Sequence, residues 1–230
     1  MKSVSFIICV YNGEKYIDRA IRSCLNQVLI DIATEVIVID DASTDNTGDV
    51  CKAFGSSIVY KRMKVNSGVS VCSNVGINLA KSEFYMRVDS DDFINNLTLM
   101  NLLPILIHNP HYDFVVNDHV RVDLHGQKNI VVSLDSIHQV FRHGAGVLFR
   151  KKSVVDAGMY DESLRNCEDF DLLAKMIFLF KSEYFHYPVP LYRYYIHDSN
   201  LTGSESRKSS WAKVAQRYNL HLEEIFDENL

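Results

Sequence analysis

The chain has 230 residues, a hydrophobic content of 47% and a formal net charge of −5. This hydrophobic fraction is ample for a full core, and the length fits one large domain or two small ones. The negative charge leaves no basic footprint for nucleic acid, so we expect no nucleic-acid partner.

The first part of the chain alternates short apolar runs with amphipathic segments. The apolar runs predict buried strands over 4–10, 34–39 and 84–88, and 57–61 is a candidate for a further strand. The segments between them predict helices over 14–27, 46–54 and 69–80. This alternation is typical of an α/β fold with a parallel, doubly wound sheet.

The second part changes character and predicts a mixed sheet. A helix over 95–107, with Pro104 disturbing its last turn, precedes a hairpin of strands 112–123 and 129–134. The remaining predicted elements are a strand over 145–150, helices over 151–157 and 169–180, two strands over 184–187 and 191–195 flanking Pro188 and Pro190, and an amphipathic helix over 204–227. We find no linker, so one domain is expected, with parts 1–92, 93–203 and 204–230.

The five cysteines are scattered and form no Cys-x-x-Cys pair, which is typical of proteins in a reducing cytoplasm. The apolar run near the N-terminus is too short for a signal peptide, and no stretch is long and apolar enough to span a bilayer. We therefore expect a cytoplasmic protein, with at most a peripheral contact at the inner face of the membrane.

Polar and acidic residues recur where the predicted parallel strands end. Right-handed crossovers would bring the loops 10–12, 40–45, 66–68 and 89–92 to one edge of the sheet. Ligands of open α/β sheets bind beyond the carboxyl ends of the strands. This edge is therefore the predicted site.

Three carboxylates, Asp89, Asp91 and Asp92, lie within four residues, with Ser90 between the first two. Like charges this close require a neutralising Lys, Arg or divalent cation. Carboxylate and hydroxyl oxygens suit Mg²⁺ or Mn²⁺, which makes the cluster a candidate metal site. The alternative is a solvated acidic turn that caps the next helix.

Five motifs, in this order along the chain, resemble those of family 2 glycosyltransferases with the GT-A fold. They are VSFIICVYN at 4–12, VIVIDDASTD at 36–45, NSGVS at 66–70, VDSDD at 88–92 and Glu168-Asp169. Beyond residue 180 the resemblance is limited to Tyr192-Arg193 and His197. The resemblance implies a GT-A fold, mostly parallel with an antiparallel C-terminal part, and a nucleotide-diphospho-sugar donor.

The resemblance also implies a nucleotide site. Asp41, together with Asp40, would hydrogen-bond the imide of the base, although both could instead cap the following helix with Thr44 and Asp45. The other residues implied in nucleotide binding are Val10, Tyr11, Asn12, Ser67, Gly68, Asp89 and Ser90.

For the divalent cation, Mn²⁺ or Mg²⁺, the resemblance implies Asp91 and Asp89 as ligands. His197 would reach the metal or the phosphates, or it is an ordinary surface residue. Arg193 would contact a phosphate or form a structural ion pair.

The resemblance assigns the catalytic base to Asp169, with Glu168 as its partner or sharing its role. A positioned carboxylate takes the proton of the acceptor hydroxyl, which then displaces the diphosphate with inversion. The structural alternative is that both acids only favour the positive N-terminus of the following helix.

One departure from the family concerns position 73. Many members carry an arginine just before the Asn of the third motif, where this chain has Ser73. A cation expected near the nucleotide is therefore missing, which leaves open how the base is held and whether the usual donor is kept. The Gln-x-x-Arg-Trp motif of processive synthases is also absent.

Taken together, the expected activity is transfer of a single sugar from a UDP-sugar to a hydroxyl of a glycan or lipid-linked acceptor. The alternatives are an inactive homologue that binds sugar nucleotides, or a nucleotidyltransferase with the same type of sheet. The latter would carry a glycine-rich, basic loop after the first strand, where this chain has Tyr11-Asn12-Gly13-Glu14. The final helix could pack on the domain or pair with a second copy in a homodimer.

Overall fold

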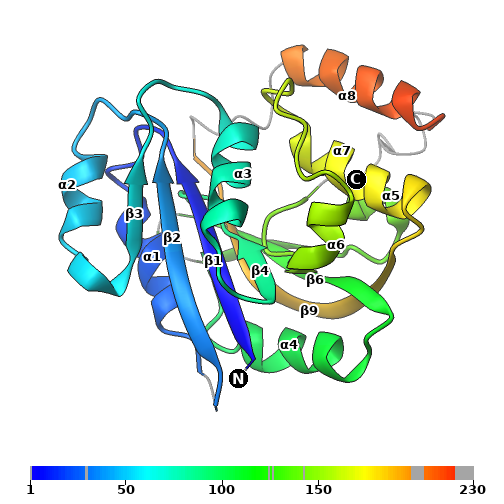
Figure 1. The fold of residues 1–230 in the computed structure, drawn as a ribbon, viewed down its shortest axis with the longest axis horizontal. Helices are drawn as coiled ribbons and strands as arrows, with labels where there is room; N and C mark the ends of the chain where they lie inside the picture. Colours follow the sequence, from blue (N-terminus) through cyan, green and yellow to red (C-terminus); the bar gives the residue numbers. More distant parts are fainter. Residues whose placement is uncertain are drawn as a thin grey trace.

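The computed structural model describes residues 2–28, 31–123, 125, 127–141, 143–197 and 205–220. Its first part is the predicted alternation of strands and helices (Figure 1). The strands are β1 (Ser3–Val10), β2 (Ala33–Asp40), β3 (Val59–Arg62) and β4 (Phe84–Arg87). The helices are α1 (Ile17–Leu25), α2 (Thr47–Lys52) and α3 (Val69–Leu79), with a 3₁₀ turn at Gly55–Ser57. Strand β1 pairs in parallel with β2 and β4, and β2 pairs in parallel with β3.

The second part extends the same sheet with mostly antiparallel pairings. Its strands are β5 (Phe93–Ile94), β6 (Tyr112–Val122), β7 (Lys128–Val132), β8 (Leu148–Arg150) and β9 (Glu183–Tyr195). Its helices are α4 (Thr98–His108), α5 (Ile137–Val140), α6 (Lys151–Asp156), α7 (Glu168–Ala174) and α8 (Glu205–Arg217), with a π-helical turn at Lys175–Leu179. Within the described residues, the sheet has the order β3-β2-β1-β4-β8-β6-β9-β5, with β7 beside β6. The predicted α/β fold class and the β6–β7 hairpin are confirmed.

Strand β1 is buried on both faces, as its continuous apolar sequence predicts. Phe6 and Ile8 belong to the core cluster that contains Ile21 of α1. Ile7 points to the opposite face and belongs to the cluster that contains Ile77 of α3. In Figure 1 the helices α1 and α3 accordingly lie on opposite faces of the sheet. This packing holds the carboxyl end of β1 beneath the site.

The prediction of two strands around Pro188 and Pro190 is wrong, because both prolines lie inside the single strand β9. The pairing of β9 with β6 passes from Asn117–Tyr187 to His119–Tyr192, so several residues of β9 lie opposite one residue of β6. Proline cannot donate a ladder hydrogen bond and is tolerated where a strand is irregular. The irregular pairing of β9 with β6 therefore accommodates both prolines within one strand.

The predicted helices differ from the structure at their ends, and helix α5 was not predicted. Helix α4 continues past Pro104 to His108, and α1 begins at Ile17 because residues 14–16 form a turn. Helix α8 packs back onto the domain, where Trp211 stacks on Phe170 at 4.7 Å between ring centroids. Positions 204 and 221–227 of the predicted final helix lie outside the described residues.

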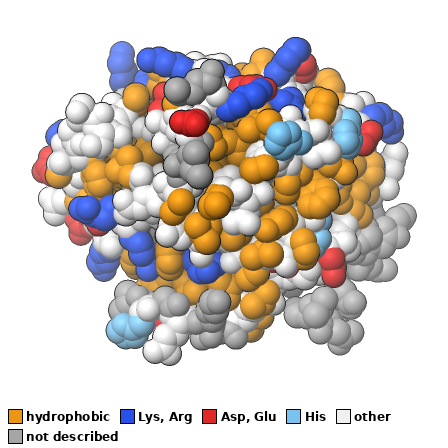
Figure 2. Space-filling view, turned by 90° about the horizontal axis from the view of Figure 1, so that it is seen from below, with side chains coloured by type: hydrophobic (Ala, Val, Ile, Leu, Met, Phe, Trp, Pro, Cys, Tyr) orange, Lys and Arg blue, Asp and Glu red, His pale blue; other side chains and the backbone are white. Residues whose placement is uncertain are grey.

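The face that carries α4 exposes hydrophobic side chains over much of its middle, with Lys and Arg toward its margins (Figure 2). Among the exposed large hydrophobic residues are Met100 of α4 and Val189 of β9. No helix in the described part of the chain is long and apolar enough to cross a bilayer.

Candidate functional site

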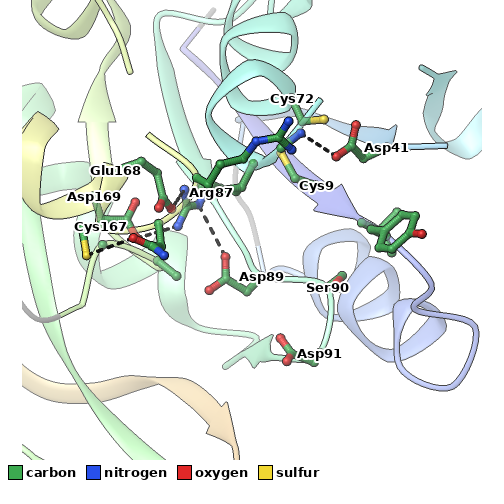
Figure 3. A pocket seen from close by; sticks show the side chains of 18 of the residues that line it. Cys9, Asp41, Cys72, Arg87, Asp89, Ser90, Asp91, Cys167, Glu168 and Asp169 are labelled. Atoms are coloured by element: carbon green, nitrogen blue, oxygen red, sulfur yellow. Dashed lines mark hydrogen bonds and ion pairs between the residues drawn. The ribbon is translucent and has the colours of Figure 1, made fainter. Parts of the chain in front are cut away.

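A cavity of about 660 Å³ lies where the loops after β1, β2 and β4 meet two segments from the second part of the chain (Figure 3). Those segments contribute residues 141, 143–145 and 165–170. The predicted site residues that line this cavity are Val10, Tyr11, Asn12, Asp41, Gly68, Asp89, Ser90, Asp91, Glu168, Asp169 and His197. The structure thus brings together acidic residues that are far apart in the sequence.

One end of the cavity is organised by Asp41. Its two carboxylate oxygens accept the backbone N–H groups of Ser67, at 2.7 Å, and Gly68, at 2.8 Å. The Asp41 N–H donates to the carbonyl of Val10 at 2.8 Å, which ties the loops after β1 and β2 together. Tyr11 is 51% exposed at this end, so its ring is available to a ligand. The arrangement leaves a fixed carboxylate beside an accessible aromatic ring.

Two residues predicted for the nucleotide site, Asp40 and Ser67, do not line the cavity. The Asp40 side chain is fully buried and accepts hydrogen bonds from the Tyr60 hydroxyl, the Ser43 N–H and the Arg62 guanidinium. Burial works against ionisation of Asp40, but these hydrogen bonds lower its pKa below the ordinary value. Ser67 contributes through its backbone N–H to Asp41. Asp40 and Ser67 therefore stabilise the loops that follow β2 and β3.

Asp89 and Asp91 lie at the middle of the cavity (Figure 3). The Nε2 atom of His197 lies 2.9 Å from Oδ2 of Asp91, so His197 joins the acidic cluster from the chain segment after β9. Arg193 points elsewhere and donates to the carbonyl of Pro190. Asp89, Asp91 and His197 offer two carboxylates and an imidazole, although no group of three or more potential metal ligands is assembled within the described residues.

The third carboxylate of the cluster, Asp92, has a structural role. It is buried and accepts hydrogen bonds from the Tyr192 hydroxyl at 2.7 Å and the Tyr195 N–H at 2.8 Å. Arg19, which lies between the rings of Phe93 and Tyr195, donates to the carbonyl of Asp91 at 2.8 Å. These contacts bind the acidic loop to β9 and α1.

Arg87, which was not predicted as a site residue, connects the carboxylates of the two halves. Its guanidinium donates to Oε1 of Glu168 at 2.9 Å and to Oδ2 of Asp169 at 2.7 Å, and Nε lies 3.4 Å from Oδ1 of Asp89. The side chain is only 3% exposed. Burial disfavours the charged form of Arg87. The neighbouring carboxylates, with the largest contribution from Asp169, nevertheless raise the pKa of Arg87 well above its ordinary value. The available signal was an arginine within an otherwise apolar, buried strand.

Asp169 and Glu168 begin α7, directly after Cys167, which adopts a left-handed conformation with φ of 63°. The side chain of Asp169 is 22% exposed, and Oδ2 is bound by Arg87. Oδ1 has no hydrogen-bond partner within the described residues. Burial raises the pKa of Asp169 to about 8, although Arg87 lowers it. Asp169 therefore titrates near neutral pH, and the exposed part of its side chain does not include Oδ1, which is buried.

Gly144 lies directly against the candidate base. A Cβ atom added at this glycine would lie 2.2 Å from Cβ and 2.3 Å from Cγ of Asp169. Only a residue without a side chain therefore lets α7 approach the segment 141–145 closely enough to place Asp169 in the cavity.

We expect Gly144→Ala to destabilise the fold by about 1–3 kcal/mol through overpacking and to displace Asp169. A displacement of about 1 Å of a catalytic group lowers turnover roughly 100-fold. Thermal unfolding and turnover measure the two effects. The control is Gly55→Ala, where nothing lies within 4 Å of an added Cβ but the φ of 54° strains alanine, so stability should fall without displacement of Asp169 and turnover should stay at the wild-type level. Wild-type turnover in Gly144→Ala would show that this contact does not position the base.

The chain matches the family model described as "Glycosyl transferase family 2" over residues 5–156. It is 29% identical over 218 residues to an uncharacterised glycosyltransferase of Rickettsia typhi, a match that covers 87% of this chain and 66% of the relative. It is 38% identical over 105 residues to the poly(ribitol-phosphate) beta-N-acetylglucosaminyltransferase TarP of Staphylococcus aureus, covering 44% of this chain and 32% of TarP. The chain thus matches less than two thirds of the length of each of these relatives.

Solved structures show the same fold. The TarS 1–349 fragment of S. aureus in complex with UDP-GlcNAc superposes with a TM-score of 0.75 at 22% identity, covering 95% of this chain and 65% of TarS 1–349. A second structure of the TarS 1–349 fragment has a TM-score of 0.69 at 25% identity, covering 85% of this chain and 60% of that fragment. These similarities confirm the predicted GT-A type of fold.

Proposed function

Because the chain belongs to glycosyltransferase family 2, we propose that it transfers one sugar from a UDP-sugar to a hydroxyl of a glycan or lipid-linked acceptor, with inversion. The observation that carries the proposal is that Asp41, the Asp89–Asp91 loop and Asp169 line one cavity. A donor bound along it would place its base at one end and its sugar near the other.

The Asp41 end supports the choice of donor. The backbone N–H groups of Ser67 and Gly68 hold both oxygens of Asp41 and leave a lone pair for an imide N–H, which uracil presents. The exposed Tyr11 ring offers a surface on which a base could stack. TarS, which shares the fold, was crystallised with UDP-GlcNAc and with UDP.

The residues at the middle of the cavity fit a divalent cation. Mg²⁺ is commonly held by one or two carboxylates together with substrate phosphates, and the hard oxygens of Asp89 and Asp91 meet that requirement. His197, whose Nε2 lies 2.9 Å from Asp91, would complete the protein's donor set with an imidazole nitrogen. When bound, the cation would offset the negative charge of the departing diphosphate.

Asp169 is the proposed general base. Its partly exposed carboxylate would accept the proton of the acceptor hydroxyl. The acceptor oxygen then forms a bond to the anomeric carbon, and the bond from that carbon to the diphosphate breaks, with the electron pair leaving on UDP. Arg87 holds Oδ2 throughout and so orients the carboxylate.

We expect Asp91→Asn to abolish metal-dependent nucleotide binding, because it removes a carboxylate charge from the proposed ligand set. EDTA should have the same effect on the wild-type protein. The control is Asp123→Asn, which removes one carboxylate that does not line the cavity. Binding of UDP to Asp91→Asn with wild-type affinity and the same metal response would remove Asp91 from the proposed site.

The proposed activity is tested by incubating the protein with UDP-, GDP- and dTDP-sugars, with Mn²⁺ or EDTA, and measuring release of the nucleotide. Metal-dependent release from UDP-sugars, with or without added glycan acceptors, supports the proposal. Binding of UDP without release under any condition would instead favour an inactive homologue that binds sugar nucleotides.

A further inference from the structure

We propose that Arg165, from the loop before α7, binds the base of the donor nucleotide and replaces the cation that is missing at Ser73. The inference rests on the proposed function, because it assigns a further residue to the same donor site. It concerns an arginine that lies far from the nucleotide motifs in the sequence.

The two arginines that line the cavity differ in their surroundings. Arg87 is buried and bound by the carboxylates of Glu168 and Asp169. Arg165 is exposed, and its Nη1 donates to the side-chain oxygen of Asn66 at 3.2 Å. Within the described residues, Arg165 forms no ion pair. Its charge is therefore available to a ligand.

The position of Arg165 places this charge at the Asp41 end of the cavity. A Cβ atom added at Gly68 would lie 3.2 Å from Cδ and 3.3 Å from Nη1 of Arg165, so the arginine lies across Gly68. The N–H of the same glycine binds the carboxylate of Asp41. Asn66, the other partner of Arg165, donates to the carbonyl of Asp41. Arg165 and Asp41 thus share the loop 66–68.

Ser73 cannot supply a cation to this end of the cavity. It is buried, its hydroxyl lies 3.6 Å from the Cys9 sulfur, and it does not line the cavity. Arg165 contacts the same loop 66–68, but it belongs to the segment that leads into α7. The described structure thus offers a basic group where the sequence motif lacks one.

The chemistry of the two side chains matches an imide base. Uracil and thymine present an N–H flanked by two carbonyl oxygens. Asp41 accepts from an N–H, and a guanidinium donates to a carbonyl with a fixed, planar geometry. A carboxylate and a guanidinium that both contact the loop 66–68 can therefore recognise neighbouring atoms of such a base. The contact is directional, so lysine should replace it poorly.

Calorimetric titration with UDP, UMP and pyrophosphate, each with Mg²⁺, tests the proposal on Arg165→Met and Arg165→Lys. We expect Arg165→Met to weaken binding of UDP and UMP by the same factor, about tenfold, as for loss of one charge-assisted hydrogen bond. Pyrophosphate binding should not change, and Arg165→Lys should recover little of the loss. The control is Lys152→Met, which removes the same charge from an exposed side chain outside the cavity.

Equal affinities of wild type and Arg165→Met for UDP would overturn the inference and leave the proposed function intact. Weaker binding of UDP and pyrophosphate with unchanged UMP, or full rescue by lysine, would assign Arg165 to the phosphates and also overturn it. Failure of the folded wild-type protein to bind any nucleotide would contradict both the inference and the proposed function.

Discussion

Arg87→Met is expected to destabilise the protein by about 3–5 kcal/mol, because it leaves buried carboxylates without their cation. Arg87 is 3% exposed and bridges Glu168, Asp169 and Asp89 at distances of 2.9, 2.7 and 3.4 Å. For a chain of this size, such a loss lowers the midpoint of thermal unfolding by roughly 10 °C. Turnover should fall as well, since Asp169 loses the group that orients it.

Thermal unfolding of Arg87→Met, Arg62→Met and Arg87→Met/Asp169→Asn separates this effect from a general loss of charge. Arg62 also pairs with a buried aspartate, but its side chain is 47% exposed, so its replacement should cost much less. The double variant should be less destabilised than Arg87→Met because one uncompensated carboxylate is gone. A midpoint for Arg87→Met that matches the wild type would contradict the bridging role.

Asp169→Asn is expected to lower turnover by about 10²–10⁴-fold while leaving UDP affinity unchanged. The amide keeps the shape of the carboxylate and a carbonyl oxygen for Arg87, but it cannot accept the proton of the acceptor hydroxyl. Steady-state rates and calorimetric affinities for the same samples measure the two effects. Full turnover in Asp169→Asn would show that another group is the base, with Glu168 the first to replace.

The pH dependence of turnover follows from the environment of Asp169. Burial raises its pKa to about 8, and a general base must be deprotonated to act. The rate should therefore increase about tenfold per pH unit below pH 8 and level off above it. A rate that is independent of pH between 6 and 9, with chemistry limiting, would contradict this environment.

The raised pKa of Asp169 also makes the stability of the fold depend on pH. A carboxyl whose folded-state pKa lies above its unfolded value of 3.8 destabilises the fold progressively as pH rises from about 4 to about 8. Asparagine lacks this penalty. We therefore expect Asp169→Asn to gain stability relative to the wild type as pH rises through this window, measured by chemical denaturation at pH 5 and pH 8. A constant difference would contradict the raised pKa.

The sequence predicted the first part of the fold well because its signals are local. Continuous β-branched runs such as 4–10 occur only where both faces of a strand are covered, and each is followed by a polar loop. Parallel topology then requires those loops to meet at one edge. For this reason Asp41, Asp89 and Asp91 were predicted to lie together before any contact was known.

Contacts between distant segments were not predictable in the same way. The sequence near Gly144 shows nothing of its close packing against Asp169, where an added Cβ atom would lie 2.2 Å from Cβ of Asp169. This packing depends on how α7 docks. Asp40 and Asp41 are neighbours in the sequence, but the alternation of side chains along β2 directs Asp40 into the protein. Pro188 and Pro190 suggested a break in β9, where the sheet instead accommodates them in an irregular pairing.

Calorimetric titration of UDP, with Mn²⁺ or EDTA, into the wild type, Asp91→Asn and Asp169→Asn is the most direct test of the proposed donor site. If the cavity is the donor site, the wild type and Asp169→Asn bind UDP only with Mn²⁺, and Asp91→Asn does not bind. If all three folded proteins bind UDP equally in Mn²⁺ and in EDTA, or none binds it, the cavity is not the metal-dependent donor site described above.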